Sequence, residues 1–549
     1  MTLTTEQQQD LHYGEVFTRP WVVEVILDLV GYTSDRDLGT LQIVEPSVGS
    51  GAFLGPIVAR LLESARRHGR TVGSLRAALR GYELQASKVD DSRRLVQEML
   101  GEAGVESQLA GEIAEVWISE ADFLLADMPV RTADFVVGNP PYIRYDDLDE
   151  RTAATYRRLW PTMHGRGDIY VGFFERGLEL LAPEGRLGYI CADRWMRNSY
   201  GAELRQHISG KYSVDHVWTM HDVDAFETQV SAYPAITVIS NRPQGVAVVA
   251  DTTVEFGESS ARKLTKAVNS DGFEDFRGGG VRAHSLAAWF TGSDLWPAGS
   301  PVRLALLERL NEHFYPLQDP ATGTKISIGI ATGADNVYVT KDPTVAEADR
   351  MLPLAMRRDL MSGHFDWRGN YLVNPWNEDG SLVDLAEYPR MAAYLASHPK
   401  LRERFVAKKS PDSWHRTIDK VQPGLTAKPK LLLQDMKSTI HPVLETGGHY
   451  PHHNLYYVTS EVWDMEVLGG LLLSRIAQSF IEAYGVRMRG GTLRFQAQYL
   501  KRIRVPDPTT MKDSTKEQLR TAFRTRDVTL STNAAAAAYG IDPEEYELD

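Results

Sequence analysis

The sequence predicts an α/β fold in which a mostly parallel, seven-stranded sheet domain over residues 1–255 is followed by a mixed α+β domain over residues 256–549. Two observations lead to this prediction. Through the first 250 residues, short apolar runs alternate with amphipathic helical segments, which is the pattern of a parallel sheet covered by helices. Beyond about residue 255 this alternation gives way to polar, glycine-rich and aromatic segments. The first domain is therefore expected to be Rossmann-like.

The individual elements of the first domain follow from the positions of these runs. Strands are expected at 41–45, 79–83, 115–119, 133–138, 185–191, 214–219 and 235–240. Helices are expected at 20–31, 52–68, 86–100, 170–182 and 199–210. The turn-forming segment SNRPQG then precedes VAVVAD, which predicts an antiparallel hairpin at the sheet edge. The domain boundary falls between residues 250 and 300, and the alanine run at 534–538 predicts a terminal helix.

Composition limits the class of protein. A chain of 549 residues has room for roughly two to four domains and for an enzyme-sized cleft. No uncharged apolar stretch reaches the about 18 residues of a membrane span, and the N-terminus lacks the features of a secretory signal. The single cysteine, Cys191, excludes internal disulfides and thiolate metal clusters. A reducing cytoplasm is the expected compartment.

Polar residues follow three successive expected strands. The first strand leads into EPSVGSGAF, where small residues allow a tight turn into a helix and close approach of a ligand. Glu83 ends the second strand, where an acid can accept hydrogen bonds from ribose hydroxyls. Asp122 and Phe123 follow the third, where they can bind the amine and the ring of an adenine. One acid per strand end along one sheet edge predicts a site for an adenosine-containing cofactor.

The spacing of these motifs distinguishes between adenosine cofactors. Glu83 lies much farther from the glycine loop than the roughly 20-residue step of a dinucleotide fingerprint. Leu54 replaces the third glycine of that fingerprint, and no Gly-Lys-Ser/Thr phosphate loop is present. A cofactor without phosphates, S-adenosylmethionine, fits these features best.

The segment VVGNPPYIRY, residues 136–145, ends the fourth expected strand. Its two prolines can neither donate to a sheet ladder nor continue a helix, so the chain must leave the strand as a stiff turn. An isolated Pro-Pro pair usually indicates only a turn with a surface tyrosine. Beside a methyl donor, the Asn139 side-chain oxygen and the Pro140 carbonyl can accept both hydrogens of an exocyclic amino group. Tyr142 can stack on the base that carries this group.

Taken in order, the segments GEVFTRP, EPSVGSGAFL, GYEL, ADFL, NPPY and DIYVGFFERGLELLAPEGRLGYI resemble the gamma-class N6-adenine DNA methyltransferases of bacterial restriction-modification systems. The resemblance implies an S-adenosylmethionine-dependent methyltransferase domain followed by a DNA target-recognition domain. It also implies cofactor binding by Thr18, Glu45, Ser47, Gly49, Gly51, Glu83, Asp122, Phe123 and Asn139. Asn139, Pro140 and Tyr142 would serve catalysis, with Phe226, or as second choice Tyr233, cradling a flipped adenine. Val48 departs mildly from relatives that carry a cysteine or another small residue.

The C-terminal half has two basic segments despite the net charge of −13. Residues 401–440 hold nine Lys or Arg against four acids, and residues 485–505 hold six against none. The segments KISIGIATGADNVYV, WHRTID, YPHHNLYYV and RMRGGTLRFQAQYLKRI are similar to the target-recognition region of Eco57I- and TaqI-like methyltransferases. DNA contacts are accordingly expected from Arg416, Lys428, Lys430, Arg487, Arg489 and Arg494. The three histidines of GGHYPHHN are not expected to bind metal, because no acid or thiol completes the set.

Several alternatives remain open on the sequence alone. NPPY turns also occur in protein-glutamine N5-methyltransferases, although about 290 C-terminal residues would then have no role. An rRNA base methyltransferase and a DNA-specificity module with an inactive transferase domain are two further readings. The expected partner is double-stranded DNA, bound by a monomer associated with the nucleoid. Any cleavage activity is expected on a separate restriction endonuclease or defence-system subunit.

Overall fold

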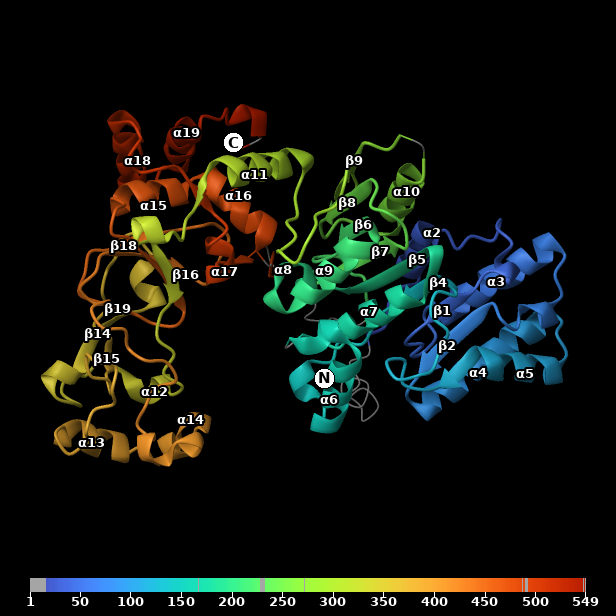
Figure 1. Cartoon of the computed structure of the whole chain (residues 1–549), viewed down its shortest axis with the longest axis horizontal. Helices are drawn as coiled ribbons and strands as arrows, with labels where there is room; N and C mark the ends of the chain where they lie inside the picture. Colours follow the sequence, from blue (N-terminus) through green and yellow to red (C-terminus); the bar gives the residue numbers. More distant parts are fainter. Residues whose placement is uncertain are drawn as a thin grey trace. The chain divides into compact units, whose positions relative to one another are not determined.

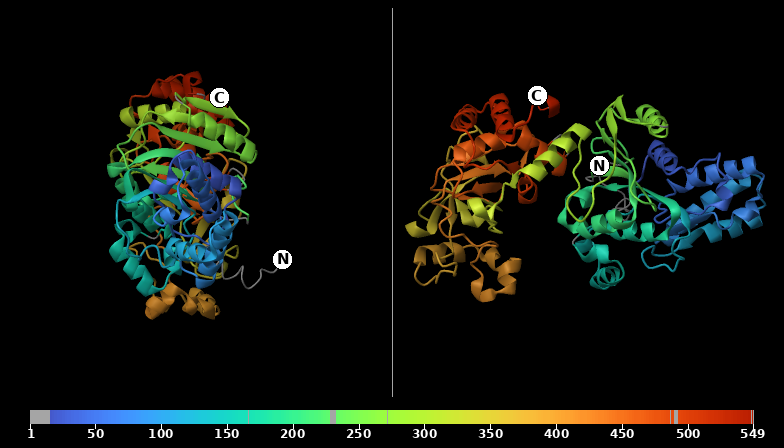
Figure 2. Two further views of the ribbon diagram at one scale, coloured as in Figure 1. Left: turned by 90° about the vertical axis from the view of Figure 1, so that its right-hand side faces the viewer. Right: turned by 45° about the horizontal axis from the view of Figure 1, so that its top comes forward.

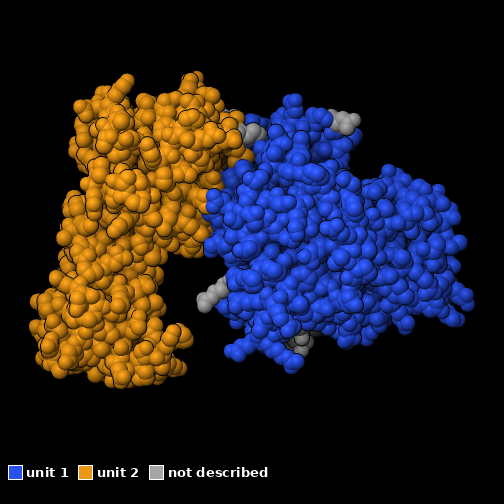
Figure 3. Space-filling view, viewed as in Figure 1, with its two compact units in different colours: residues 1–301 blue, residues 302–549 orange. Residues whose placement is uncertain are grey.

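The computed structural model describes residues 16–165, 167–227, 233–270, 272–485, 487–488, 492–546 and 548. The chain forms two compact units, Met1–Pro301 and Val302–Asp549, shown in different colours in Figure 3. The boundary predicted after residue 255 therefore lies inside the first unit. The reason is that residues beyond 255 still pack against the first sheet, since Ala261 and Leu264 are buried in its core.

A ten-stranded sheet forms the centre of unit 1. The seven predicted strands occupy seven adjacent positions in the order β3-β2-β1-β4-β5-β7-β6, and β7 runs antiparallel to both neighbours. Their bounds are Ile43–Glu45 (β1), Leu79–Glu83 (β2), Ile118–Glu120 (β3), Ala133–Gly138 (β4), Leu181–Ala192 (β5), Ser213–Thr219 (β6) and Pro234–Ser240 (β7). The carboxyl ends of the parallel strands β1, β2, β3 and β4 consequently lie at one edge of the sheet.

The prediction of an edge hairpin after β7 is wrong. Strand β8 (Ala247–Thr252) pairs in parallel with β6, which separates it from β7. The loop between β7 and β8 passes beside β6. In this loop the Gln244 side chain forms hydrogen bonds with both the N–H and the carbonyl of Val214 in β6, at distances of 3.0 and 3.2 Å. Strands β10 (Val281–Leu286) and β9 (Asp275–Gly278) then extend the sheet beyond β8.

Helices cover both faces of this sheet (Figure 1, Figure 2). One core contains side chains from α2 (Pro20–Val30), α3 (Leu54–His68), α4 (Ala86–Glu102), α5 (Ser107–Trp117) and α10 (Glu258–Val268). The other contains side chains from α6 (Glu150–Leu159), α7 (Tyr170–Leu180), α8 (Arg194–Arg197) and α9 (Ala202–Lys211). Successive residues of a strand point to opposite faces, so Phe135 and Val137 enter the first core and Val136 the second.

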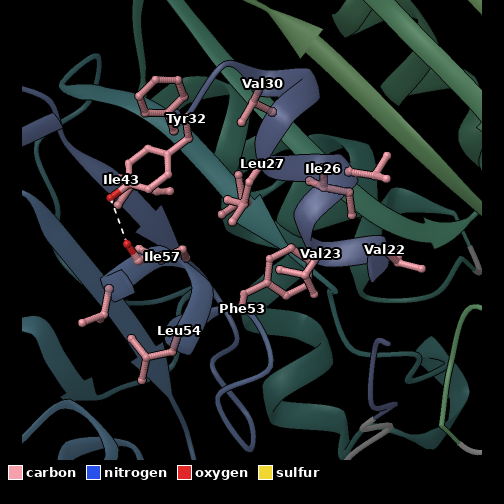
Figure 4. Close-up of a cluster of buried hydrophobic side chains, with 14 of the residues drawn as sticks. Val22, Val23, Ile26, Leu27, Val30, Tyr32, Ile43, Phe53, Leu54 and Ile57 are labelled. Carbon is pink, nitrogen blue, oxygen red and sulfur yellow. Dashed lines mark hydrogen bonds between the residues drawn. The ribbon is translucent and has the colours of Figure 1, made fainter. Parts of the chain in front are cut away.

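The packing of α2 against the start of α3 fixes the loop that follows β1. Figure 4 shows Val23 and Leu27 of α2 directed toward Phe53 and Ile57. The hydroxyl of Tyr32 donates a hydrogen bond of 3.4 Å to the carbonyl of Ile57, and this is the dashed line in the figure. Because side chains on both sides of the loop are buried, its backbone has a defined path at the sheet edge.

Unit 2 has the mixed α+β character predicted from the sequence. Its largest antiparallel sheet has the order β12-β20-β16-β18, with bounds Lys325–Ile328 (β12), Leu455–Thr459 (β20), Lys430–Gln434 (β16) and Val443–Glu445 (β18). A second sheet has the order β13-β15-β14-β19, with bounds Val339–Thr340 (β13), Tyr371–Val373 (β15), Met351–Ala355 (β14) and Tyr450–Pro451 (β19). Small sheets are formed by β17 (Met436–Lys437), β22 (Thr492–Arg494) and β21 (Arg487–Met488), and by β11 (Tyr315–Pro316) with β23 (Arg504–Val505).

The helices of unit 2 include the one predicted over the alanine run. Their bounds are Pro301–His313 (α11), Asp335–Tyr338 (α12), Pro389–Ala396 (α13), Phe405–Lys409 (α14), Met465–Leu473 (α15), Arg475–Tyr484 (α16), Ala497–Leu500 (α17), Asp513–Thr525 (α18) and Val528–Tyr539 (α19). The alanines at 534–536 are buried in α19, which confirms that helix. Among the described residues, none of the helices combines the length and apolar character needed to cross a bilayer.

Candidate active site

A cavity of about 480 Å³ opens at the carboxyl edge of the sheet in unit 1. Most of the predicted cofactor-binding residues line it, namely Thr18, Glu45, Ser47, Gly49, Glu83, Asp122, Phe123 and Asn139. Apart from Thr18, which precedes α2, these residues lie at or just after the ends of β1, β2, β3 and β4, which are parallel and adjacent. Gly51, Pro140, Tyr142 and Phe226 are absent from the cavity lining.

The glycine loop after β1 turns as its composition predicts. Gly49 and Gly51 have φ values of 55° and 87°, a region that favours glycine. At Gly51 a Cβ atom would also lie 3.0 Å from Leu95 Cδ2. Gly51 thus shapes the turn without lining the cavity.

Glu83 connects this loop to β2. One of its carboxylate oxygens accepts a hydrogen bond of 2.8 Å from the N–H of Gly49. The other accepts from the N–H groups of Leu84 and Gln85 at 2.8 and 2.9 Å. A carboxylate can accept about four hydrogen bonds, so Glu83 retains capacity for a ligand hydroxyl while holding the loop in place.

Glu45 is a buried acid in the cavity wall. Its side chain is 1% exposed, and no described residue forms a hydrogen bond with its Oε2 atom. Burial, followed by the negative charge of Glu83, raises the pKa of the Glu45 carboxyl well above its usual value of 4.5. A buried carboxylate needs a positive or hydrogen-bonding partner, which makes Glu45 suited to a cationic ligand group.

Asp122 and Phe123 form another part of the wall. Asp122 accepts hydrogen bonds from the N–H of Leu124 at 2.8 Å and from the hydroxyl of Tyr156 at 2.7 Å. The Phe123 ring stacks on Phe173, with centroids 5.2 Å apart. Burial, and then the hydrogen bond to Asp122, raise the pKa of Tyr156, so its hydroxyl remains a donor.

Tyr156 and Phe173 also line the cavity and were not among the predicted site residues. They belong to α6 and α7, which follow the strand-end motifs in sequence. The DIYVGFFERG segment carried a family resemblance that includes Phe173, but nothing local in the sequence distinguishes Tyr156.

The NPPY turn holds the N-terminal segment against the sheet. The Asn139 Nδ2 atom donates to the carbonyl of Val16 at 2.8 Å and to the hydroxyl of Thr18 at 3.2 Å. The other amide atom, Asn139 Oδ1, is buried and has no hydrogen-bonding partner in the described part of the chain. An orphaned buried acceptor is unusual in proteins and commonly marks a place where a ligand supplies the donor.

Two aromatic rings lie beyond the turn. The centroids of Tyr142 and Phe226 are 6.4 Å apart, with ring planes at 83°. Phe226 forms an isolated β-bridge with Thr18, so the segment that lines the cavity also positions this ring. Tyr233 instead packs against His221 at 5.4 Å, and the structure therefore brings Phe226, not Tyr233, beside Tyr142.

The predicted DNA-contacting residues have different environments in unit 2. Lys428 has a 57% exposed side chain, 4.0 Å from Glu461. Arg416 is half-buried, with its guanidinium 5.8 Å from the centre of the Trp376 ring. Arg494 is paired with Asp435 at 2.7 Å. The side chain of Arg487 and the whole of Arg489 lie outside the described residues.

The prediction that Lys430 contacts DNA is wrong. Its side chain is 0% exposed and forms a buried ion pair with Glu445. Lys430 also donates to the carbonyl of His449 at 3.1 Å. Burial lowers the pKa of Lys430, an effect that Glu445 opposes. Lys430 begins the central strand β16, all of which is buried, so it stabilises the sheet.

The inference that no acid completes the histidine segment is also wrong. Asp335, distant in sequence, lies 3.0 Å from Nε2 of His452 and 3.9 Å from Nδ1 of His453. His449 is separate from this group and pairs with Glu445 at 3.0 Å.

Comparison with known proteins identifies relatives over nearly the full length. Residues 101–226 match the family model described as Eco57I restriction-modification methylase. The chain is 42% identical to the Type II methyltransferase M.XhoI of Xanthomonas vasicola, over 97% of this chain and 98% of the relative. It is also 42% identical to the Type II methyltransferase M.PaeR7I of Pseudomonas aeruginosa, over 97% of this chain and 92% of the relative.

Solved structures with a similar fold include two DNA complexes. The Type IIL restriction-modification enzyme MmeI in complex with DNA has a TM-score of 0.59 at 12% identity, covering 95% of this chain and 74% of that chain. A nuclease-deletion mutant of the Type ISP enzyme LlaGI, bound to a DNA substrate mimic, has a TM-score of 0.52 at 12% identity. The alignment covers 93% of this chain and 46% of that chain. At this level of identity the similarity concerns the fold.

Proposed function

The chain belongs to the Type II methyltransferases of restriction-modification systems, and from this membership we propose that it methylates the exocyclic N6 of an adenine flipped out of duplex DNA. DNA methylation follows from the family. The proposal further specifies which base is methylated, which atom of that base accepts the methyl group and which residues of the chain catalyse the transfer. It rests above all on the buried, unpartnered Oδ1 atom of Asn139 at the cavity edge.

Asn139 and Pro140 would orient the acceptor. The Nδ2 atom of Asn139 is already engaged by Val16 and Thr18, which leaves Oδ1 directed away from those partners. This oxygen and the Pro140 carbonyl would accept the two N–H hydrogens of the adenine amine, and the nitrogen lone pair would then face the methyl donor. The same acceptors would stabilise the positive charge that develops on the nitrogen.

The cavity would hold the methyl donor. S-adenosylmethionine, when bound, would supply an electrophilic sulfonium methyl group. Glu45 would accept from the cationic amino-acid end, Glu83 from the ribose hydroxyls and Asp122 from the adenine amine. The fit is supported by the unpartnered Glu45 Oε2 atom in the cavity wall and by the spare acceptor capacity of Glu83. Phe123 would contact the adenine ring, while Thr18, Ser47 and Gly49 would complete the cavity wall.

Double-stranded DNA is the proposed substrate. Tyr142 and Phe226 would contact the extruded base, since stacking on aromatic rings compensates for lost base stacking. Unit 2 would provide sequence recognition, with Lys428 and Arg416 near the phosphates. The shared fold with MmeI, which was solved with DNA, supports this assignment. We further propose that the protein acts as a monomer on DNA and that a separate restriction endonuclease supplies cleavage.

The alternative substrates receive less support. The relatives at 42% identity are Type II methyltransferases over almost the whole chain, including the C-terminal half that a protein-glutamine methyltransferase does not need. They likewise favour DNA over ribosomal RNA. The acids of the cavity and Asn139 are all present, which argues against an inactive specificity module.

Methylation-sensitive sequencing tests the proposed base. Genomic DNA from cells that express the protein should carry N6-methyladenine at one sequence motif, and DNA from cells with the empty vector should not. N4-methylcytosine at the motif would replace the adenine assignment while preserving exocyclic-amine chemistry. Absence of any methylated motif would contradict the proposal.

Two variants separate alignment of the base from its extrusion. Asn139→Ala should slow methyl transfer by about 100- to 1000-fold, as expected for loss of one preorganised polar group. Tyr142→Ala removes a stacking contact worth roughly 1–3 kcal/mol. That loss should be partly rescued when the target adenine lies opposite a mismatch, because such a base is easier to extrude.

A single-turnover assay on matched and mismatched duplexes makes the measurement. The Asn139 defect should persist on mismatched DNA, because the base reaches the site but is poorly aligned. Equal rescue of both variants would contradict the separate roles. Full activity of Asn139→Ala would contradict the assignment of an amino-methyltransferase.

A further inference from the structure

Three side chains from two distant segments of unit 2 converge on one point. Asp335 is the first residue of α12, and His452 and His453 directly follow β19. One potential ligand atom from each of the three lies within 4.8 Å of the other two. We propose that this cluster of Asp335, His452 and His453 binds a divalent transition-metal ion of the zinc class, a site that methyl transfer itself does not require.

The two distances from Asp335 to the histidines are close to the separation of ligands around a small ion, and the shorter one is a hydrogen bond between Asp335 and His452. Two ligand atoms each about 2.0–2.1 Å from a tetrahedral Zn²⁺ lie roughly 3.3 Å apart. The Asp335 Oδ2 atom lies 3.0 Å from His452 Nε2 and 3.9 Å from His453 Nδ1, on either side of that value. All three ligand atoms lie within 4.8 Å of one another, so an ion bound between them would need only local side-chain adjustment.

An independent observation points to a missing ligand at this place. Among the residues that the structure describes, the buried Nδ1 atom of His453 has no hydrogen-bonding partner, although the His453 side chain as a whole is 43% exposed. Its separation of 3.9 Å from Asp335 is too long for a hydrogen bond. A metal ion between the two groups would satisfy the buried Nδ1 atom of His453, while Asp335 Oδ2 would exchange its hydrogen bond to His452 for a bond to the metal.

The surrounding backbone holds the three side chains in place. The hydroxyl of Thr332, a fully buried residue, donates to Oδ1 of Asp335 and leaves Oδ2 directed at the histidines. The N–H of His453 donates to the carbonyl of Ile330 at 3.0 Å, and the N–H of His452 donates to that of Ala355 at 3.1 Å. Such outer contacts orient metal ligands and raise affinity.

Gly329 allows the two segments to approach this closely. A Cβ atom at that position would lie 2.3 Å from the carbonyl oxygens of Pro451 and His452. The backbone before Asp335 is thus packed directly against the backbone that carries the histidines. The geometry of the cluster is therefore a property of the fold and does not depend on exposed, mobile loops.

The ligand chemistry selects the class of ion. Two imidazoles and one carboxylate suit Zn²⁺, Co²⁺ or Ni²⁺, whereas Ca²⁺ and Mg²⁺ prefer oxygen ligands alone. Asp335 and His453 are each 43% exposed, so water can complete the coordination. A bound ion would join α12 to the segment between β19 and β20 and would stabilise unit 2.

Metal titration of the untagged, full-length protein tests the site. After dialysis against a chelator, the wild type should bind one Zn²⁺ per chain by calorimetry, and its melting temperature should rise with Zn²⁺. Asp335→Asn and His453→Ala, at half-exposed positions, should each remove this binding. Thr332→Val should weaken it by about 10- to 100-fold, as for other residues that orient ligands.

His364→Ala is the matched control, because His364 is an exposed histidine of unit 2 outside the cluster. This variant should bind Zn²⁺ like the wild type. Co²⁺ in place of Zn²⁺ should give visible ligand-field absorption that Asp335→Asn abolishes. Circular dichroism of each variant verifies folding. Failure of the wild type to bind Zn²⁺, or equal binding by the wild type and both cluster variants, would overturn the proposal.

Discussion

Glu45 shows how burial prepares a single residue for a charged ligand. Its carboxyl is 1% exposed in the cavity wall, and Glu83 is the nearby acid that opposes its ionisation. Both effects favour the protonated form in the free protein, and a cation placed beside Oε2 would favour the carboxylate. Binding of a cationic cofactor and loss of a proton from Glu45 should therefore be coupled.

We predict that the affinity for S-adenosylmethionine depends on pH through Glu45. The free protein holds the pKa of Glu45 well above 4.5, so at lower pH part of the binding energy is used to remove a proton. Affinity should rise as pH increases toward the raised pKa and become constant above it. Calorimetry between about pH 5 and pH 8 measures this slope.

Two variants isolate the source of that slope. Glu45→Gln should abolish it and weaken binding at high pH by about ten- to a hundredfold, the value of a hydrogen bond to a charged group. Glu120→Gln should leave both affinity and slope unchanged, because Glu120 is an exposed acid at the end of β3 outside the cavity. An unchanged slope in Glu45→Gln would exclude Glu45 as the titrating group.

Residues at strand ends could be found from sequence, and residues on later helices could not. Glu45 and Glu83 end β1 and β2, Asp122 lies two residues beyond β3 and Asn139 directly follows β4, so the local strand pattern locates them. Tyr156 meets Asp122 only because α6 folds back over the cavity, a long-range contact that no nearby residue indicates.

At the level of elements, strand β16 shows that basic sequence does not imply a basic surface. Lys428 and Lys430 lie two residues apart in one cationic segment, yet Lys428 is exposed and Lys430 is buried. The register pairs Lys430 of β16 with Glu445 of β18, so the two charges meet inside the sheet. Charge counts along the chain could not reveal this pairing, because Glu445 comes from another strand.

We predict opposite phenotypes for these two lysines. Lys430→Ala should destabilise unit 2 by about 3–5 kcal/mol, because Glu445 would remain buried without its lysine, and the contact with His449 would not replace the lost ammonium. Lys428→Ala should change stability by less than about 0.5 kcal/mol. If Lys428 contacts a phosphate, Lys428→Ala should change the plot of the logarithm of the DNA-binding constant against the logarithm of salt concentration. The slope of that plot should become less steep by about one unit.

Thermal unfolding and DNA binding at several salt concentrations make both measurements. The double variant Lys430→Met with Glu445→Leu provides the control, since replacing both charges of a buried pair by apolar groups is often nearly neutral. Normal stability of Lys430→Ala would show that the buried pair is unimportant. A melting temperature lowered by Lys428→Ala would contradict its placement on the surface.

The positions of the strands were predictable from the sequence, but their order in the sheet was not. All seven predicted strands form within a few residues of their expected positions, because alternating apolar runs are local signals. The position of β8 beyond β6 was not predicted, since it depends on the long-range parallel pairing of β6 with β8. Tertiary pairing of this kind leaves no periodic trace in the sequence.

At the scale of the whole molecule, the extension of the first sheet decides where a separable unit ends. Residues beyond 255 add α10, β9 and β10, and Trp289 and Trp296 are buried in one of the two cores. Without them β8 would become an uncovered edge strand with an apolar sequence, which promotes aggregation. The fading of the α/β pattern near 255 therefore marks a change of architecture within one unit.

We predict that a fragment of residues 1–301 folds and binds S-adenosylmethionine as the full chain does, whereas a fragment of residues 1–255 aggregates. The longer fragment keeps every residue that lines the cavity and every strand of the ten-stranded sheet. The shorter one exposes buried side chains of both cores, each worth roughly 1.5–3 kcal/mol when buried. Size-exclusion chromatography and calorimetry distinguish these outcomes.

The fragment of residues 1–301 also tests whether cofactor binding and DNA recognition belong to different units. Residues 1–301 should bind cofactor but lose sequence-specific methylation, because phosphate and base contacts are assigned to residues 302–549. Addition of a separately purified 302–549 unit should not restore specificity at low concentration, since without the covalent link the units no longer have a high effective concentration. A well-folded 1–255 fragment would show that the added strands are dispensable. Site-specific methylation by 1–301 alone would place the reading of DNA in the first unit and leave the second without its assigned role.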